Sequence, residues 1–277
     1  MGKAWFVTGA SSGLGRLMTE RLLARGDRVV ATVRRDGALT DLEQKHGDTL
    51  VVAKLDVTDT NGIRATVAEA FGSMGRIDVV VSNAGYGLFG AAEELSDAQI
   101  DDQIATNLTG SIQLIRAVLP HLRRQGGGRI MQVSSEGGQM AYPSFSLYHA
   151  TKWGIEGFIE AVAQEVAPFG IAFIIAEPGP TATNFGASLA LSTPMDIYDD
   201  TPVGAIRRLR DEGNFTLKGD AGRMVDAVIA AADSRTPSFR LALGSTAYEH
   251  ISRELSKRLA AIEAQRSVAF AADRGEQ

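Results

Sequence analysis

The segment TGASSGLG, residues 8–15, joins a short apolar run, residues 4–7, to a segment with helical periodicity. Its three glycines, Gly9, Gly13 and Gly15, let the chain turn tightly and let a ligand approach the backbone without a Cβ in the way. A helix that starts here presents free N–H groups and the positive end of its dipole, which favour a phosphate. The segment predicts a phosphate-binding loop after the first strand of an α/β sheet. The alternative is a plain strand-to-helix turn, for which about one glycine suffices.

Short apolar runs alternate with helical segments along the rest of the chain. We expect strands at residues 4–8, 28–33, 50–55, 77–82, 128–134, 171–177 and 240–243, and helices at 14–24, 61–71, 97–124, 148–166 and 221–232. Continuous apolar runs such as residues 79–81 are typical of strands buried on both faces. The alternation predicts an α/β fold with a doubly wound, mostly parallel, seven-stranded sheet and helices on both faces.

No repeat or low-complexity linker divides the chain, so we expect a single domain over residues 1–277. Residues 184–219 contain several glycines and prolines with weak periodicity, and we expect them to form a substrate loop or lid. Residues 248–277 carry apolar residues at helical spacing and then become polar. We expect a helix packed on the edge of the domain with a frayed end, in preference to a helix that binds a partner.

The composition limits the class of protein. The chain is 44% hydrophobic and 22% charged, which is ordinary for a soluble globular protein. A net charge of -5 disfavours nucleic acid as a partner, and the absence of cysteine excludes disulfides and thiolate metal sites. No signal peptide and no apolar run long enough to span a membrane is evident, so we expect a cytoplasmic protein without a membrane partner. The four histidines are scattered, and no metal site is predicted.

The glycine spacing T-G-x-x-x-G-x-G and several later motifs resemble the short-chain dehydrogenase/reductase superfamily in register over about residues 3–185. The later motifs are Leu55-Asp56-Val57, Asn83-Ala84-Gly85, Asn107, Ser135 with Tyr148 and Lys152, and Pro178-Gly179. The resemblance implies a Rossmann fold that binds NAD(P). It implies cofactor contacts from Gly9, Ser11, Ser12, Gly13, Leu14, Gly15, Asp56, Val57, Asn83, Ala84, Gly85, Tyr148, Lys152, Pro178, Gly179, Thr181 and Thr183.

The end of the second expected strand, VVATVRR, bears on the choice between NAD(H) and NADP(H). An NAD site places a carboxylate there for the ribose hydroxyls, whereas an NADP site has a cation for the 2′-phosphate. Val33 occupies the family's usual Asp position, and Arg34 and Arg35 follow it. Because a guanidinium binds phosphate bidentately, we expect NADP(H) with Arg34 as a contact. The alternative, a pair of solvated arginines, leaves the missing acid unexplained.

Tyr148 and Lys152 are four residues apart and therefore share one face of a helix. A nearby ammonium favours the phenolate and lowers the pKa of a tyrosine toward the working pH, so we expect Tyr148 to act as general acid and base. His149 is expected to point off this face. The pattern Y-x-x-x-K alone is common on surface helices. The resemblance implies that Ser135 hydrogen-bonds the same substrate oxygen and that Asn107 anchors a water linking Lys152 to solvent.

The strand end ATVRR, residues 31–35, the run NAGYG, residues 83–87, and the extended segment after residue 184 most resemble the hydroxysteroid- and retinol-dehydrogenase-like branch. This resemblance implies an NADP(H)-dependent carbonyl reductase or alcohol dehydrogenase acting on a bulky, apolar ketone or secondary alcohol, with Glu136 and Tyr142 in the substrate site. A non-catalytic NADP(H)-sensing regulator of the same fold is the alternative, which the presence of all four catalytic residues disfavours. An epimerase or dehydratase would need a larger domain. Relatives pair the helices that correspond to residues 97–124 and 148–166, which implies a homodimer or homotetramer.

Overall fold

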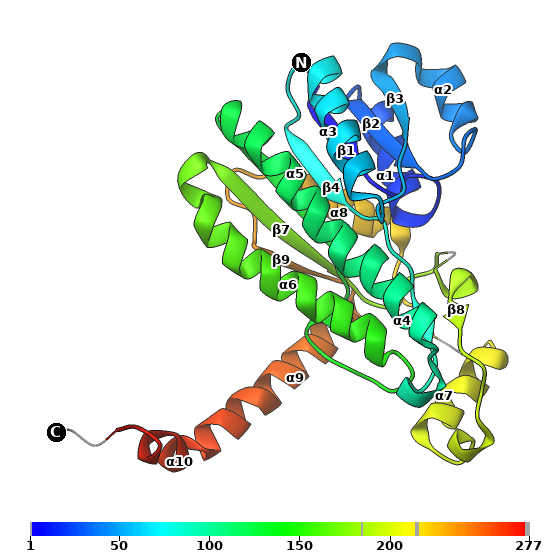
Figure 1. Ribbon diagram of the computed structural model, residues 1–277, viewed down its shortest axis with the longest axis vertical. Helices are drawn as coiled ribbons and strands as arrows, with labels where there is room; N and C mark the ends of the chain where they lie inside the picture. Colours follow the sequence, from blue (N-terminus) through cyan, green and yellow to red (C-terminus); the bar gives the residue numbers. More distant parts are fainter. Residues whose placement is uncertain (1, 184, 214–215, 275–277) are drawn as a thin grey trace.

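The computed structural model describes residues 2–183, 185–213 and 216–274. Its main feature is a sheet of seven parallel strands in the order β3-β2-β1-β4-β6-β7-β9 (Figure 1). The strands are β1 (Ala4–Val7), β2 (Arg28–Val33), β3 (Leu50–Lys54), β4 (Val79–Ser82), β6 (Gly128–Val133), β7 (Ile171–Pro178) and β9 (Arg240–Leu243). Because the order runs outward from β1 and β4 in both directions, the doubly wound parallel fold is confirmed.

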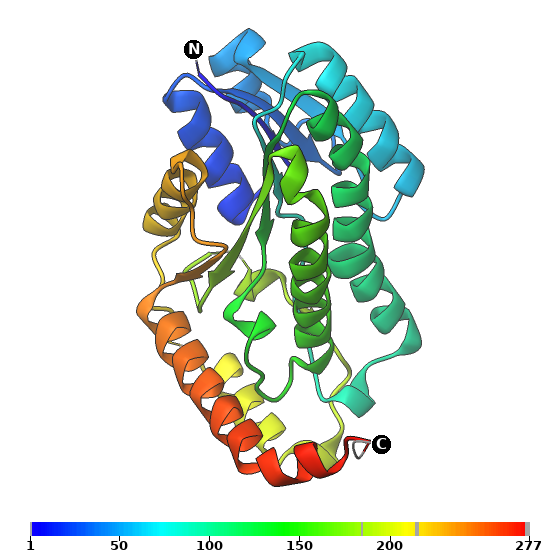
Figure 2. The same ribbon diagram turned by 90° about the vertical axis from the view of Figure 1, so that its left-hand side faces the viewer.

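Helices cover both faces of this sheet, as the edge-on view in Figure 2 shows. One face carries α1 (Gly13–Ala24) and α8 (Ala221–Asp233), and the other carries α3 (Thr60–Met74), α5 (Gly110–Arg124) and α6 (Ser146–Val166). Successive strand residues point to opposite faces. Trp5 and Val7 therefore join one apolar core while Phe6 joins the other. This double burial explains why β1 and β4 are apolar at almost every position.

The helix expected over residues 97–124 is interrupted. The structure has α4 (Asp97–Gln103), a π-helical turn (Ile104–Thr109) and then α5. Asn107 lies in the π-helical turn, where its carbonyl oxygen accepts a hydrogen bond from Ser111 Oγ at 3.1 Å. Such turns are rare inside helices and are frequent at functional sites. A further helix that we did not expect, α2 (Thr40–His46), follows β2.

The segment expected as a loop or lid is partly ordered into regular structure. It contains β8 (Ala190–Leu191) and α7 (Pro202–Asp211), and β8 pairs in parallel with β5 (Leu88–Phe89). The chain returns to the main body at Gly219, which forms a bridge with Thr181. Residues 184, 214 and 215 of the expected lid lie outside the described residues.

The carboxyl-terminal part departs from the expected packed helix with a frayed end. Helix α9 (Ser245–Ala264) buries only its first turns, through Ala247 and Ile251, and then runs away from the sheet (Figure 1). Leu259 and Ile262 are 60% and 67% exposed, because the helix continues past the edge strand β9. A second helix, α10 (Arg266–Ala271), follows it, and residues 275–277 lie outside the described part. Within the described ranges, no helix is long and apolar enough to cross a bilayer.

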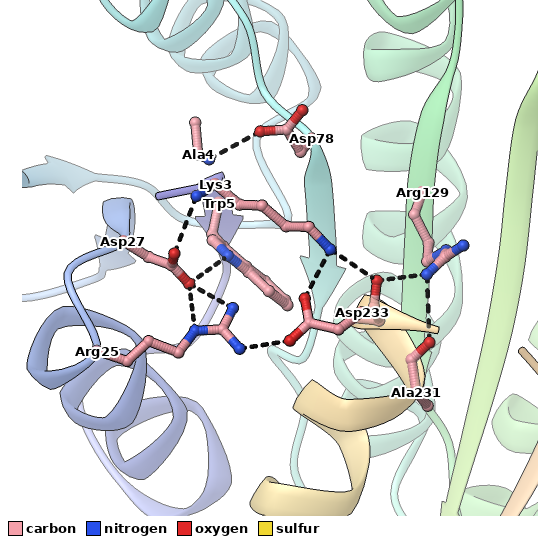
Figure 3. A network of polar contacts seen from close by, with 10 residues as sticks. Lys3, Ala4, Trp5, Arg25, Asp27, Asp78, Arg129, Ala231 and Asp233 are labelled. Carbon is pink, nitrogen blue, oxygen red and sulfur yellow. Dashed lines mark hydrogen bonds and ion pairs between the residues drawn. The ribbon is translucent and has the colours of Figure 1, made fainter. Parts of the chain in front are cut away.

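A polar network closes the amino-terminal end of β1 (Figure 3). The buried carboxylate of Asp27 accepts hydrogen bonds from the backbone N–H of Lys3 at 2.9 Å and from Trp5 Nε1 at 3.0 Å. Arg25 bridges Asp27 to Asp233 on α8, and Lys3 Nζ also reaches Asp233, at 2.6 Å. The network fixes β1 at the end opposite to the glycine loop.

Candidate active site

The candidate site lies at the carboxyl ends of four neighbouring strands. The glycine loop follows β1, Asn83 follows β4, Ser135 lies just beyond β6, and Gly179 follows β7. The carboxyl ends of parallel strands meet at one edge of a sheet, where α/β proteins bind ligands. Segments far apart in the sequence are therefore brought to one place.

The glycine loop is hydrogen-bonded to Asn83 on one side and has open space at Gly13. Gly9 and Gly13 have φ angles of 66° and 55°, in the left-handed region that favours glycine. Asn83 Nδ2 donates to the carbonyl oxygens of Thr8 and Gly9 at 2.9 and 3.2 Å. A Cβ on Gly15 would collide with Gly9 and Asn83, whereas a Cβ on Gly13 would meet nothing within 4 Å. The open space thus lies over Gly13, at the start of α1.

This open space fits the pyrophosphate of a dinucleotide. Ser12 is the N-cap of α1, yet its hydroxyl makes no capping hydrogen bond, and Ser11, Ser12 and Gly13 are exposed. The first-turn N–H groups of a helix have no partner within the helix, so they are available to an anion. Leu14 is half-buried beneath them.

The region where the adenosine of the cofactor is expected carries a negative charge on Asp56 and a positive charge on Arg34. Asp56 Oδ1 accepts hydrogen bonds from the N–H and hydroxyl of Thr58 at 2.9 and 2.8 Å, which lowers the pKa of the carboxyl. The charge of Arg34 lowers it further, so Arg34 lies near Asp56. Both Arg34 and Arg35 are exposed, and Val33 is buried in β2. Val57 is buried beside them and Ala84 is half-buried.

Tyr148 and Lys152 meet on α6, and both are buried. Lys152 Nζ lies 5.6 Å from the centroid of the Tyr148 ring and donates a hydrogen bond to the Val133 carbonyl oxygen at 3.0 Å. Burial raises the pKa of Tyr148 to about 12, while hydrogen bonding by the Ser135 hydroxyl acts in the opposite direction. The expected lowering of this pKa toward the working pH is therefore not found, because burial outweighs it. Burial also lowers the pKa of Lys152 to about 8. Three of the four residues expected to be catalytic are thus brought together.

The fourth, Asn107, is tied to the segment after β4. Its Oδ1 accepts a hydrogen bond from the Tyr86 N–H at 3.0 Å, and its Nδ2 donates to the Tyr86 carbonyl oxygen at 2.8 Å. A longer contact of 3.4 Å joins Nδ2 to Thr151 Oγ1, next to Lys152 in sequence. A Cβ on Gly85 would stand 3.1 Å from Asn107 Oδ1. Asn107 therefore holds the segment after β4 against α6.

The turn after β7 is also fixed by several hydrogen bonds. Gly179 N–H donates to the Leu243 carbonyl oxygen at 3.0 Å, and Thr181 Oγ1 donates to the Gly179 carbonyl oxygen at 2.7 Å. Thr183 Oγ1 accepts from the N–H of Phe185 at 3.2 Å. This turn, which carries four of the expected cofactor contacts, is thus continuous with the start of the expected lid, and Pro178 ends β7.

Aromatic rings surround the Tyr148 phenol. Phe185 from the lid lies 5.8 Å from Tyr148, and Phe145 lies 6.1 Å from it, both measured between ring centroids. Tyr142 packs edge-on against His149 with the ring centroids 4.5 Å apart. The His149 ring is buried, and its Nδ1 lies 3.0 Å from the Gly137 carbonyl oxygen, so it packs against the segment that follows Ser135.

Glu136 is buried near Tyr148. Its charge contributes to raising the pKa of both Tyr148 and Tyr142. Its Oε2 lies 3.2 Å from Nδ1 of His250 on α9, a contact that the sequence did not reveal. Burial raises the pKa of Glu136, and His250 opposes this shift. In the part of the chain that the structure describes, no trio of His, Asp or Glu side chains could hold a metal ion.

One buried carboxylate adds to the β5–β8 pairing in joining the expected lid, residues 184–219, to the body. The Glu94 side chain is fully buried and accepts hydrogen bonds from the Met195 N–H at 2.8 Å, Ser192 Oγ at 3.2 Å and Arg207 at 2.5 Å. It also accepts from the Ala91 N–H at 2.9 Å. These contacts hold the pKa of Glu94 below its usual value in spite of burial. Glu94 therefore joins β8 and α7 to the chain that follows β5.

Comparison with known sequences gives one consistent family. The family model described as short chain dehydrogenase matches residues 3–192. A protein of Botryotinia fuckeliana, oxidoreductase BOA17, is 37% identical over 98% of this chain and 99% of its own length. A 3-ketodihydrosphingosine reductase of Bacteroides thetaiotaomicron is 32% identical over 86% of each chain.

Comparison with solved structures agrees. A short-chain dehydrogenase of Streptomyces avermitilis superposes with a TM-score of 0.90 at 38% identity, over 98% of this chain and all of that one. A short-chain dehydrogenase of Burkholderia cenocepacia in complex with NADP has a TM-score of 0.73 at 26% identity, over 95% of this chain and 97% of that one. Other solved neighbours are complexes with 5-hydroxy-NADP, with NADH and with NADP+.

Proposed function

Because the chain belongs to the short-chain dehydrogenase/reductase family, we propose that it is an NADP(H)-dependent oxidoreductase acting on ketones and secondary alcohols. The family itself is one of oxidoreductases. The observation that carries the finer proposal is the meeting of Tyr148, Lys152 and Ser135 at the edge of the sheet that also carries the glycine loop.

The chemistry divides between cofactor and protein. The bound cofactor supplies the hydride. In reduction, Tyr148 donates a proton to the carbonyl oxygen while the Ser135 hydroxyl hydrogen-bonds the same atom. Because burial raises the pKa of Tyr148 to about 12, the phenol is protonated at neutral pH, as a proton donor must be. The ammonium of Lys152, 5.6 Å from the ring centroid, stabilises the phenolate that remains. Asn107 holds the segment after β4 against α6 and anchors the proposed water.

Two observations support NADP(H) rather than NAD(H). Arg34 is exposed at the end of β2, near Asp56, and among the described residues it forms no ion pair that would occupy its guanidinium. The position before it, where a carboxylate would bind the ribose, is the buried Val33. A solved relative binds NADP. The 2′-phosphate of NADP(H) would accept hydrogen bonds from Arg34.

The surroundings of Tyr148 support a bulky, apolar substrate. Phe89, Phe145 and Tyr148 form an apolar cluster, against which Tyr142 and Leu189 pack. A curated relative is named for a reductase of 3-ketodihydrosphingosine, a ketone. We propose that Glu136 and Tyr142 line the substrate site and that residues 184–219 cover it.

A non-catalytic NADP(H) sensor is the competing function, and one substitution separates the two. Tyr148→Phe is expected to abolish NADPH-dependent reduction of a ketone panel, such as acetone, acetophenone and decalone, and to retain NADPH binding measured by cofactor fluorescence. The control is Tyr248→Phe, because Tyr248 is 67% exposed. If Tyr148→Phe reduces ketones at the original rate, Tyr148 is not the proton donor. If the unmodified protein binds NADPH and reduces no carbonyl compound, the sensor is the better account.

Three further expectations stay proposals. A single domain over residues 1–277 would give one cooperative unfolding transition in calorimetry. A homodimer or homotetramer would be detected by analytical ultracentrifugation. A cytoplasmic location would be checked by fractionation.

A further inference from the structure

A buried carboxylate that the proposed chemistry does not use lies directly beyond the catalytic lysine. Glu156 follows Lys152 by four residues on α6, so the two side chains stack on one face of the helix. Only 2% of Glu156 is exposed. Burying a carboxylate is costly unless it is paired and hydrogen-bonded, so its partners need an account.

Two partners fix the position of the Glu156 carboxylate. Ser134 Oγ donates to Oε1 at 2.5 Å, and Arg240 on β9 donates to Oε2 at 2.6 Å. There is no room for a Cβ on Gly138, because the carboxylate of Glu156 occupies that place. The side chain is therefore held from α6, from β9 and from the chain directly before Ser135.

The cation that pairs directly with Glu156 is shared with other carboxylates. Arg240 also pairs with the buried Glu177 at 2.5 Å and with the exposed Glu160 at 2.6 Å. Gln139 Nε2, which is uncharged, donates to both oxygens of Glu177 at 2.8 Å. One guanidinium thus faces two buried carboxylates, Glu156 and Glu177. The charge of the buried Lys152 ammonium also acts on Glu156, although no direct ion pair joins these two described side chains.

Lys152 in turn depends on Glu156 for a negative neighbour. Its direct hydrogen bond goes to an uncharged acceptor, the Val133 carbonyl oxygen. Burial favours the neutral amine and lowers its pKa to about 8, and Glu156 is the carboxylate whose charge opposes that shift. The coupling is mutual: burial raises the pKa of Glu156, and the charge of Lys152, together with Arg240 and Ser134, opposes that rise.

We propose that Glu156 is a positioning residue that keeps Lys152 as its protonated ammonium beside Tyr148, with Ser134 and Arg240 holding the carboxylate in place. This inference rests on the proposed function, since it assumes that the protonated lysine assists Tyr148. Glu156 does not touch the reacting atoms; it acts through the lysine.

Other charged groups face the same pair of side chains. Glu136, beyond β6, acts on Tyr148 and is paired with His250 on α9. Glu156 also acts on Tyr148, in the same direction as Glu136. Glu177 on β7 and Arg240 interact with Glu156, which is the charged group that acts on the pKa of Lys152. Neutralising Glu156 leaves Glu136 and His250 in place, so a change in pH dependence is assigned to Glu156.

Glu156→Gln is the test. Without the negative charge, both Lys152 and Tyr148 lose their protons at lower pH. The alkaline limb of kcat for ketone reduction should therefore move to lower pH by about 1 unit or more. The rate is measured from pH 6 to 10 with NADPH and the best ketone of the panel. An unmoved limb with a uniformly lower kcat would mean that Glu156 is merely structural and would overturn the inference.

Two variants serve as controls. Glu160→Gln removes the exposed partner of Arg240 and leaves Ser134, Glu156 and Lys152 untouched, so its pH profile should coincide with that of the wild type. Glu156→Asp keeps the negative charge. Its alkaline limb of kcat should therefore lie close to the wild-type pH, even if the shorter side chain lowers kcat. A limb displaced as far by Glu156→Asp as by Glu156→Gln contradicts a role for the charge.

A measurement on the unmodified protein covers the case in which Glu156→Gln does not fold. The Lys152 ε-carbon signal, assigned by its loss in Lys152→Met, is followed by NMR against pH. It should show a second, smaller inflection at the pH where the Glu156 carboxyl carbon titrates. Independent titration of the two signals contradicts the inference. The two proposals fail separately. Ketone turnover by Tyr148→Phe would contradict the proposed function. If Tyr148→Phe is inactive but the pH profile of kcat of Glu156→Gln coincides with that of the wild type, only this inference is contradicted.

Discussion

The ammonium of Lys152 lies 5.6 Å from the centroid of the Tyr148 ring, with both side chains buried. Its hydrogen bond goes to a backbone carbonyl oxygen rather than to a carboxylate. A buried ammonium without a directly paired carboxylate lowers the stability of the folded protein. The same loss of solvation lowers the pKa of Lys152 to about 8.

Lys152→Met is therefore expected to make the protein inactive and more stable. At pH 7 the free energy of unfolding should rise by on the order of 1 to 3 kcal/mol. An unfolded lysine keeps its proton up to its ordinary pKa of 10.5, whereas the folded one releases it near 8. The cost is present in full below pH 8 and is lost as the pH rises toward 10.5, so the advantage of the variant should shrink over that range.

Denaturant unfolding at several pH values checks this. Lys257→Met is the matched control, because the Lys257 side chain is 66% exposed. A variant less stable than the wild type at pH 7 would show that the buried charge is better compensated than its contacts suggest.

Arg34→Ala is expected to weaken NADPH binding and to leave NADH binding unchanged. Loss of charge-assisted hydrogen bonds to the 2′-phosphate should raise the Kd for NADPH by about 10- to 100-fold. Fluorescence titration with both cofactors measures this. Arg35→Ala is the control, since Arg35 is equally exposed but, unlike Arg34, has no described interaction with Asp56. Equal weakening toward both cofactors, or no change toward either, would refute Arg34 as the phosphate contact.

Glu94→Gln is expected to loosen the lid. The substitution removes the negative charge that binds Arg207 and weakens the contact to Met195. Proteolysis within α7 should therefore be faster than in the wild type. The KM for the ketone should rise, with a smaller change in kcat. Asp199→Asn, at the other, 57% exposed partner of Arg207, is the control. Cleavage at the wild-type rate would show that Glu94 does not anchor the lid.

The same carboxylate predicts a pH dependence. Because the folded-state pKa of Glu94 lies below its ordinary value, its stabilising contribution is complete above the pKa of an unfolded glutamate. It is lost as the pH falls through the lower, folded value. Protease sensitivity of the lid should therefore rise in acid in the wild type and change less with pH in Glu94→Gln.

Asp27→Asn is expected to lower stability without altering the kinetic constants. The carboxylate is buried and holds Lys3, Trp5 and Arg25 at the far end of β1 (Figure 3), so its loss should cost about 2 to 4 kcal/mol. Asp233→Asn removes a 38% exposed member of the same network and should cost about 1 kcal/mol or less. A changed KM for NADPH in Asp27→Asn would mean that the two ends of β1 are coupled.

The sequence by itself determined the fold and the position of the cofactor cradle. Strands buried on both faces must be apolar throughout, and φ angles such as those of Gly9 and Gly13 favour glycine, so both leave a local pattern. The proximity of Tyr148 and Lys152 was likewise readable, because the two share a helix face, whereas Ser135 was implied by the family resemblance.

Only the tertiary structure decided what surrounds these residues. Arg240 meets Glu156 across 84 positions, Arg207 meets Glu94 across 113, and His250 meets Glu136 across 114. Contacts of such separation leave no periodicity or spacing in the chain, since each partner is one charged residue among many. The burial of His149 and the exposure of Leu259 and Ile262 depend in the same way on which elements pack nearby, and a helical pattern alone does not specify its neighbour.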